Sequence, residues 1–177
     1  PIFKKLPKYG FNEVDSCLID KCIEISKRAT FSKEISWDFL QNELLWIKGQ
    51  DPSTLQNTSI EKSYVMLQYY WKNKFFQLHN NEEELNRQFI DIYGLQEELT
   101  PDVSLEDITI LKEETRIVKN ELVFNANEVF TQFISYAVGC MFGRYSLDKA
   151  GLILANQGET LEDYLALIER SRKEVLF

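Results

Sequence analysis

Apolar residues recur with a heptad spacing through residues 58–101, and this stretch sets the expected architecture. The repeat passes through Ile60, Tyr64, Leu67, Trp71, Phe75, Leu78, Leu85, Phe89 and Ile92. One apolar stripe with this spacing predicts a single long amphipathic helix of coiled-coil type. At ~1.5 Å per residue the helix is roughly 50 Å long, so it needs packing partners along its length.

Both ends of this helix carry recognisable stop signals. Thr58 and Glu61 have the spacing of a capping box, in which each side chain accepts a hydrogen bond from the other residue's backbone amide. Gly94 can take the left-handed conformation after the last turn, and Pro101 prevents the helix from resuming. A second helix could instead begin at Asn81, but the heptad spacing is kept across that point and favours one helix.

The segment before the long helix predicts two shorter helices. Asn12 can cap a helix over residues 13–28, and a dense apolar pattern predicts another over residues 40–47. Between them, residues 35–39 alternate between apolar and polar, as a strand or an extended plug would. We expect Trp37, Phe39 and Trp46 to anchor this region by burial.

Beyond Pro101 the pattern changes from helical spacing to alternation. Residues 115–118 and 121–124 predict a β-hairpin around Lys119-Asn120, because Asn tolerates positive φ at such a turn. Residues 108–111 are a candidate third strand.

Two further helices follow the hairpin. Asn125 and Glu128 resemble a capping box for a helix that reaches Met141 and ends near Gly143, and Thr160 can cap a last helix. The fold class expected is therefore mainly α, a helical domain built on one long amphipathic helix with a small β-hairpin.

Composition indicates one globular region. The chain has 177 residues, 44% hydrophobic and 13% aromatic, enough for a single domain over residues 1–177. Turn-forming joints allow subdivisions at 1–50, 58–101 and 108–177. The start at Pro1 favours a piece excised from a larger protein.

The charge balance argues against a domain that binds DNA by itself. The formal net charge is −8, whereas such domains usually carry a basic face. Lysines do gather at Lys4, Lys5 and Lys8, but such clusters are commonly solvated tails. Three irregularly spaced cysteines and the absence of a long apolar run predict a cytoplasmic protein without disulfides or a zinc site.

Motifs for enzyme chemistry are missing from the sequence. There is no Gly-x-Gly for a dinucleotide or S-adenosylmethionine loop, and no Gly-Lys-Ser/Thr for a phosphate loop. Pro101-Asp102 could open a magnesium nuclease site, but no Asp/Glu-x-Lys accompanies it, so a turn is favoured. His79 has no nucleophile near it in sequence, and residues 82–84 point in different directions on a helix and suit a solvated face. We therefore predict no catalytic, cofactor-binding or metal-binding residue.

One helix end is a candidate contact site. Gly139 and Gly143 permit close approach of a neighbouring helix. Arg144 and Tyr145 follow directly, where a fixed guanidinium and phenol could contact a DNA phosphate or another domain. Ordinary capping and packing is the alternative and is favoured, because helix ends commonly have no other role.

Two long stretches resemble a known family. Residues 82–101, which read EEELNRQFIDIYGLQEELTP, and residues 133–148, FISYAVGCMFGRYSLD, resemble the PglX family of adenine-specific DNA methyltransferases of BREX phage-defence systems. Ser36-Trp37-Asp38-Phe39 is a weaker match, and Ile92-Tyr93-Gly94-Leu95 is similar to helix ends in type IIG restriction-modification enzymes.

The resemblance implies a supporting role within a larger enzyme. In that family the S-adenosylmethionine pocket and the Asn-Pro-Pro-Tyr loop lie upstream of these stretches, and this sequence has no adjacent prolines, so no catalytic residue carries over. The expectation is a non-catalytic helical connector from the carboxyl-side half, which supports recognition of DNA beside the methyltransferase and target-recognition domains. A docking module for other defence-system proteins is the alternative.

Overall fold

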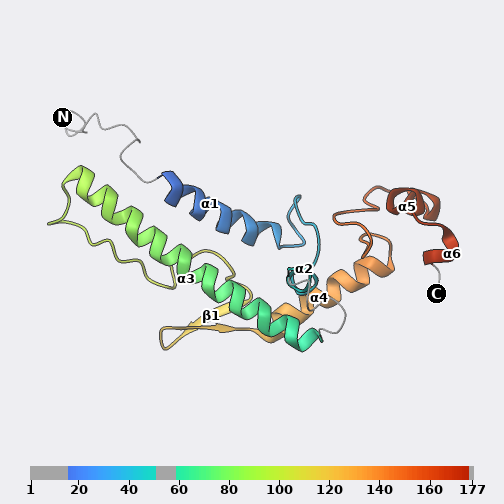
Figure 1. Cartoon of the computed structure of the whole chain (residues 1–177), viewed down its shortest axis with the longest axis horizontal. Coiled ribbons are helices and arrows are strands. Elements are labelled where there is room, and N and C mark those ends of the chain that lie inside the picture. The colour runs from blue at the N-terminus through green and yellow to red at the C-terminus, as the bar shows by residue number, and fades with distance from the viewer. Residues whose placement is uncertain (1–15, 51–58, 176–177) are drawn as a thin grey trace. The chain divides into compact units, whose positions relative to one another are not determined.

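Helices make up most of the structure, and the described residues form one small sheet, a two-stranded antiparallel hairpin (Figure 1). The computed structural model describes residues 16–50 and 59–175. Its elements are α1 (Ser16–Phe31), α2 (Glu43–Gly49), α3 (Ile60–Tyr93), β1 (Thr115–Val118), β2 (Glu121–Phe124), α4 (Ala126–Met141), α5 (Leu161–Ile168) and α6 (Arg172–Val175). The predicted mainly α class with a small β-hairpin is confirmed. None of the described helices is long and apolar enough to cross a membrane.

The chain divides into two units, each assembled from two separate stretches. Unit 1 comprises Pro1–Ala29 and Gln68–Phe124, and unit 2 comprises Thr30–Leu67 and Asn125–Phe177. The first turns of α3 therefore belong to unit 2 and the remainder to unit 1. The single connector domain over residues 1–177, with subdivisions at 1–50, 58–101 and 108–177, stays a prediction.

α3 begins and ends at identifiable caps. The Ser59 hydroxyl accepts a hydrogen bond from the Lys62 amide at 3.2 Å, whereas the expected cap Thr58 lies outside the described residues. At the other end Gly94 has φ +66°, and the Leu95 amide donates to the Ile90 carbonyl at 3.0 Å. This reversal is the glycine C-cap that the sequence predicts.

Unit 1 packs around one side of α3. Trp71, Phe75 and Leu78 are at most 2% exposed, and their spacing of four and three residues puts them on one face of the helix. Burial of each such side chain stabilises a fold by about 1.5–3 kcal/mol. α1 lies against this helix, since burial raises the pKa of the Cys22 thiol and the Glu82 carboxylate of α3 adds to the shift. Whether the whole domain is built on one amphipathic rod stays a prediction.

The chain after α3 folds back along it. His79 Nε2 lies 2.7 Å from the Val103 carbonyl oxygen, Glu83 accepts from the Val103 amide at 3.2 Å, and Asn86 donates to the Pro101 carbonyl at 3.2 Å. We call residues 94–104 the strap. Glu83 is half-buried and bonded here, so the expected solvated face over residues 82–84 is wrong at this position.

The hairpin is confirmed, and its predicted third strand is wrong. β1 and β2 pair with Thr115 opposite Phe124, and the turn residues Lys119 and Asn120 have φ of +52° and +64°. Residues 108–109 are irregular and residues 110–111 form a turn instead. They bury Ile108, Ile110 and Leu111 without pairing to the sheet, so alternation here reflects burial rather than strand formation.

Unit 2 contains α2, α4, α5 and α6. Residues 35–39 form turns rather than a strand, and Trp37 is 101% exposed, so the expected anchoring by Trp37 is wrong. Phe39 is buried as predicted, and Trp46 is half-buried. α2 begins two turns before Gly49 with Asn42 as its cap, since the Asn42 side chain accepts from the Leu44 amide at 3.0 Å.

The two predicted helix caps in unit 2 differ in outcome. Thr160 caps α5 as predicted, and the structure adds a reciprocal bond with Asp163 that completes a capping box. Asn125 precedes α4 but makes no side-chain cap bond, so the capping box with Glu128 is wrong. The helix ends at Met141, and Gly143 with φ +76° turns the chain, close to the predicted end.

Candidate interdomain or nucleic-acid contact site

The chain after α4 turns back onto the last turn of the helix. Gly143 has φ +76°, a conformation that glycine tolerates without cost. As a result, the Arg144 and Tyr145 amides both point at the Gly139 carbonyl oxygen, at 2.9 and 3.4 Å. This reversal sends the two candidate side chains to different environments.

Tyr145 enters the core of unit 2. Its ring stacks on that of Tyr136 with centroids 5.1 Å apart, and Phe39 meets both rings edge-on at 5.4 and 5.9 Å. These are preferred aromatic geometries and add to the free energy of burial. We call Phe39, Tyr136 and Tyr145 the aromatic cluster.

Gly139 makes room for the ring of Tyr145. A Cβ at this position would lie 2.6 and 2.8 Å from ring carbons of Tyr145. The glycine therefore permits close approach as predicted, but the group that approaches is an aromatic ring and not a neighbouring helix.

Glu34 joins the cluster to α4. One carboxylate oxygen accepts from the Tyr145 hydroxyl at 3.1 Å, and the other accepts from the Ser135 hydroxyl at 2.8 Å. Burial and the Glu34 charge raise the pKa of Tyr145 to about 12. The phenol is therefore a neutral hydrogen-bond donor under ordinary conditions.

Tyr136 and Cys140 also have raised pKa values. The Tyr136 hydroxyl donates to the Ser146 carbonyl at 3.2 Å, and burial raises its pKa well above the usual range. Burial also raises the pKa of the Cys140 thiol. A thiol needs a lowered pKa to act as a nucleophile near neutral pH, so the cluster has a packing role.

Arg144 remains on the surface. Its side chain is exposed, and its guanidinium carbon lies 5.5 Å from the centroid of the Tyr145 ring. The structure thus separates the predicted pair into a surface cation and a core phenol. Contact of either residue with DNA or with another domain stays a prediction.

The described residues contain no cluster suited to a metal. No group of three His, Cys, Asp or Glu side chains among residues 16–50 and 59–175 could hold an ion. His79 has 14% side-chain exposure, and its Nε2 lies within hydrogen-bond distance of the Val103 carbonyl oxygen of the strap.

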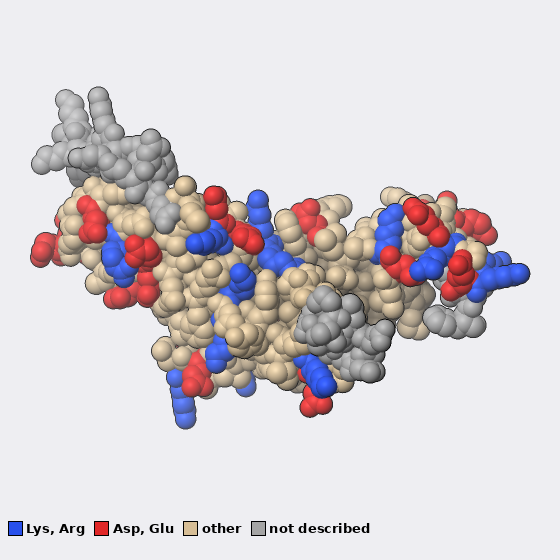
Figure 2. All heavy atoms as spheres, in the orientation of Figure 1, with Lys and Arg blue, Asp and Glu red and all other residues tan. Residues whose placement is uncertain are grey.

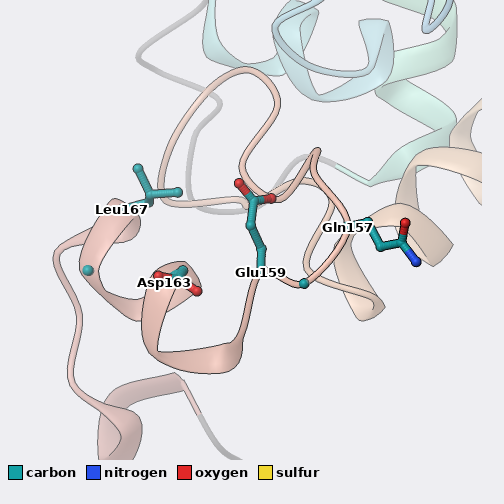
Figure 3. A pocket seen from close by; sticks show the side chains of 6 residues that line it. Gln157, Glu159, Asp163 and Leu167 are labelled. Carbon is teal, nitrogen blue, oxygen red and sulfur yellow. The ribbon is translucent and has the colours of Figure 1, made fainter.

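A shallow depression of about 470 Å³ beside α5 is lined in part by Glu159 and Asp163. Figure 3 shows Gln157 pointing away from Asp163 and Leu167. Glu159 accepts from the Ala155 and Asn156 amides at 2.6 and 2.8 Å, and Asp163 completes the cap of α5. Because both carboxylates already accept backbone hydrogen bonds, the depression has the features of a folded loop and helix start.

Surface charges do not gather into a basic field on the face in Figure 2. Lys and Arg atoms are interspersed there with Asp and Glu atoms. Arg170 pairs with Asp148 at 2.9 Å, and Arg87 pairs with Glu84. The predicted lysine cluster at Lys4, Lys5 and Lys8 lies outside the described residues.

Two features of the site escaped prediction from the sequence. Glu34 lies more than a hundred positions from Tyr145 and Ser135, and no local pattern connects them. The second is an exposed apolar face on α4, for which the sequence does carry a signal, since residues 129–142 include no Asp, Glu, Lys or Arg.

Sequence comparison gives clear relatives. The chain is 37% identical over 138 residues to the adenine-specific methyltransferase PglX of Lacticaseibacillus casei (strain Zhang), covering 78% of this chain. The chain is homologous to part of the PglX and BrxX adenine-specific methyltransferases. The adenine-specific methyltransferase BrxX of Escherichia coli O9:H4 (strain HS) is 31% identical over 159 residues, covering 88% of this chain. The matched region spans only 10% of PglX and 12% of BrxX. No protein-family model matches the chain.

Proposed function

We propose that this chain is a non-catalytic connector within a larger adenine-specific DNA methyltransferase of phage defence, of the BREX type. It positions DNA-recognition elements against the methyltransferase domain, which supplies S-adenosylmethionine binding and catalysis. The partners proposed are the methyltransferase and target-recognition domains of the same polypeptide, with DNA bound through them in the cytoplasm.

One observation carries this proposal. The chain aligns over 78–88% of its length with a region that is only about a tenth of PglX and BrxX, and it contains no Asn-Pro-Pro-Tyr and no Gly-x-Gly. Methyl transfer to an extruded adenine needs a donor pocket and a base pocket. The aligned region therefore supports a role outside the chemistry.

The first test is an activity assay on the isolated chain. It is incubated with S-adenosylmethionine and adenine-containing duplex DNA, and methyl transfer and cofactor binding are measured. We expect neither. Methyl transfer, or cofactor binding at micromolar concentration, would exclude a purely supporting role.

The second test concerns positioning in the protein encoded by the complete reading frame. Gly139→Ala should disturb the aromatic cluster and slow site-specific methylation, while the affinity for S-adenosylmethionine stays unchanged. Gly49→Ala is the matched control, because nothing lies within 4 Å of a Cβ there. If Gly139→Ala weakened cofactor binding as much as methylation, the connector role would be wrong.

A docking module for separate defence-system proteins is the second candidate. The observation in its favour is the large exposed apolar side chains of unit 2, which include Trp37 and Met141. A pull-down with the isolated chain against purified proteins of the same defence system tests it. Failure to retain any of them would leave the connector as the explanation.

A further inference from the structure

α4 is apolar on two opposite faces, and only one of them is covered within unit 2. Val129, Tyr136 and Gly139 are buried. On the opposite side, Ile134, Val138, Met141 and Phe142 are 61%, 43%, 82% and 80% exposed. Val138 is four residues from Ile134, and Met141 and Phe142 are three and four residues from Val138, so the four side chains lie along one surface of the helix end. We call these four residues the α4 face.

The composition of α4 marks this exposure as unusual. Residues 129–142 include no charged side chain, and a helix that is hydrophobic all round is typically buried on all sides. Single exposed apolar residues need no explanation, whereas a contiguous row indicates an interaction surface. Earlier turns on the same side carry exposed Asn127 and Thr131, so the apolar surface is confined to the second half of the helix.

The neighbouring backbone is held in place. Ser135, which borders the α4 face, donates to Glu34, and Glu34 also accepts from the buried Tyr145. The aromatic cluster packs behind the helix through Tyr136. Packing and hydrogen bonds on the other sides of α4 therefore hold the α4 face in place. A surface that is already ordered loses less conformational entropy when it binds a partner.

We propose that the α4 face docks against an uncharged apolar surface on another domain of the same longer polypeptide. This inference rests on the proposed function. The relatives are about eight to ten times longer than the matched region, so a covalently linked domain is present at a high effective concentration. The absence of charge on the face requires an apolar partner surface, because burial of an unpaired charge against it would be costly. A net charge of −8 opposes pairing of two copies.

The two methionines of the chain allow a test without mutation. Met141 is 82% exposed on the α4 face, and Met66 is half-buried in the part of α3 that belongs to unit 2. Both proteins, the isolated chain and the product of the complete reading frame, are treated with dilute hydrogen peroxide. Each methionine thioether gains one oxygen from peroxide, which is reduced to water, and mass spectrometry follows the sulfoxide at each site.

We expect Met141 to oxidise several-fold faster than Met66 in the isolated chain, since sulfoxidation follows exposure. In the longer protein the rate at Met141 should fall by about tenfold while the rate at Met66 is unchanged. Equal Met141 rates in the two proteins would overturn the proposal. Protection that grows with the concentration of the isolated chain would assign the face to a second copy, and protection that needs an added protein would assign it to a separate partner; both outcomes overturn it.

A variant pair separates docking from folding. Ile134→Gln with Met141→Gln should speed proteolysis of the longer protein by several-fold, whereas Thr131→Gln, on the same side but outside the face, should not. The free energy of unfolding of the isolated chain should be the same for both, because these side chains are exposed. If the longer protein with the double substitution is cleaved no faster, the α4 face is unoccupied and the proposal fails, while the activity assays still decide the connector role independently.

Discussion

Gly139 allows the Tyr145 ring to pack closely against α4 in unit 2. Replacing it with Ala puts a methyl group 2.6 Å from the Tyr145 ring, so the ring or the helix must move. Overpacking of this kind costs about 1–3 kcal/mol. Because Ala is also the better helix former by roughly 1 kcal/mol, we expect Gly139→Ala to lower the free energy of unfolding by a net amount of up to about 2 kcal/mol, measured by urea denaturation.

The control for this substitution is Gly49→Ala, in the last position of α2. Nothing lies within 4 Å of a Cβ there, and Ala is the better helix former by roughly 1 kcal/mol. Stability should stay the same or rise. A Gly139→Ala protein as stable as the parent would show that the ring of Tyr145 is less tightly held than its geometry indicates.

Ionisation of Tyr145 should lower the free energy of unfolding at alkaline pH. Its pKa is raised from 10.0 to about 12, first by burial and then by Glu34. Folding favours the protonated phenol, so this contribution is fully present below pH 10 and is lost as the pH rises from about 10 to 12. Urea denaturation at pH 8 and pH 11 should show a smaller loss for Tyr145→Phe than for the parent chain.

The exposed Tyr69, at 72%, supplies the comparison. Tyr69→Phe should leave the loss of stability between pH 8 and pH 11 unchanged. At pH 8, Tyr145→Phe should itself cost about 1 kcal/mol, because the hydrogen bond to Glu34 is removed. Identical alkaline behaviour of the two variants would contradict the assignment to Tyr145.

Among the elements, the strap along α3 is held by side-chain bonds at three positions. Glu83→Ala removes the acceptor for the Val103 amide and should speed hydrogen exchange of that amide by about tenfold, corresponding to roughly 1.4 kcal/mol. Glu83→Gln keeps a carbonyl oxygen in the same place and should change the rate little. Exchange rates measured by NMR that are equal for both variants would show that the bond does not hold the strap.

Elements were predictable where the signal is local. Gly94 ends α3 and Lys119-Asn120 turns the hairpin because both signals depend on positive φ, which few residues tolerate. The Thr160 cap needs only a partner three residues away. The alternation at residues 108–111 gave a wrong strand prediction, because a buried loop and a strand can share an apolar pattern. Only the tertiary fold decides between them.

The candidate site was less predictable, for a related reason. Arg144 and Tyr145 stand out because they follow a helix end, but the burial of Tyr145 depends on Phe39 and Glu34 from a distant part of the chain. Trp37 illustrates the reverse, since an aromatic residue expected in the core is 101% exposed. Such placements arise from long-range packing, which no spacing rule encodes.

At the scale of the whole molecule, the charge balance limits direct DNA binding. With a net charge of −8, we expect the isolated chain to bind duplex DNA no tighter than non-specific binding, roughly 10⁻⁴–10⁻⁶ M. Fluorescence anisotropy of a labelled duplex at 150 mM salt is the measurement. Nanomolar binding would contradict this expectation and assign a recognition role to the chain itself.

Arg144 can be tested within the proposed longer protein. If its guanidinium contacts a phosphate, Arg144→Gln should reduce the slope of log affinity against log salt by about 0.9. Arg87→Gln is the control, since Arg87 is an exposed arginine in unit 1 that pairs with Glu84. An unchanged slope for Arg144→Gln would favour a contact with another domain.

The hairpin tip offers a practical attachment point. Lys119 and Asn120 are exposed and have the positive φ values of a tight turn, and exposed turns of this kind tolerate insertions best. A short peptide tag or a fluorophore introduced there would project from unit 1 on two short strands. Energy transfer to a second label would then follow the movement of this segment.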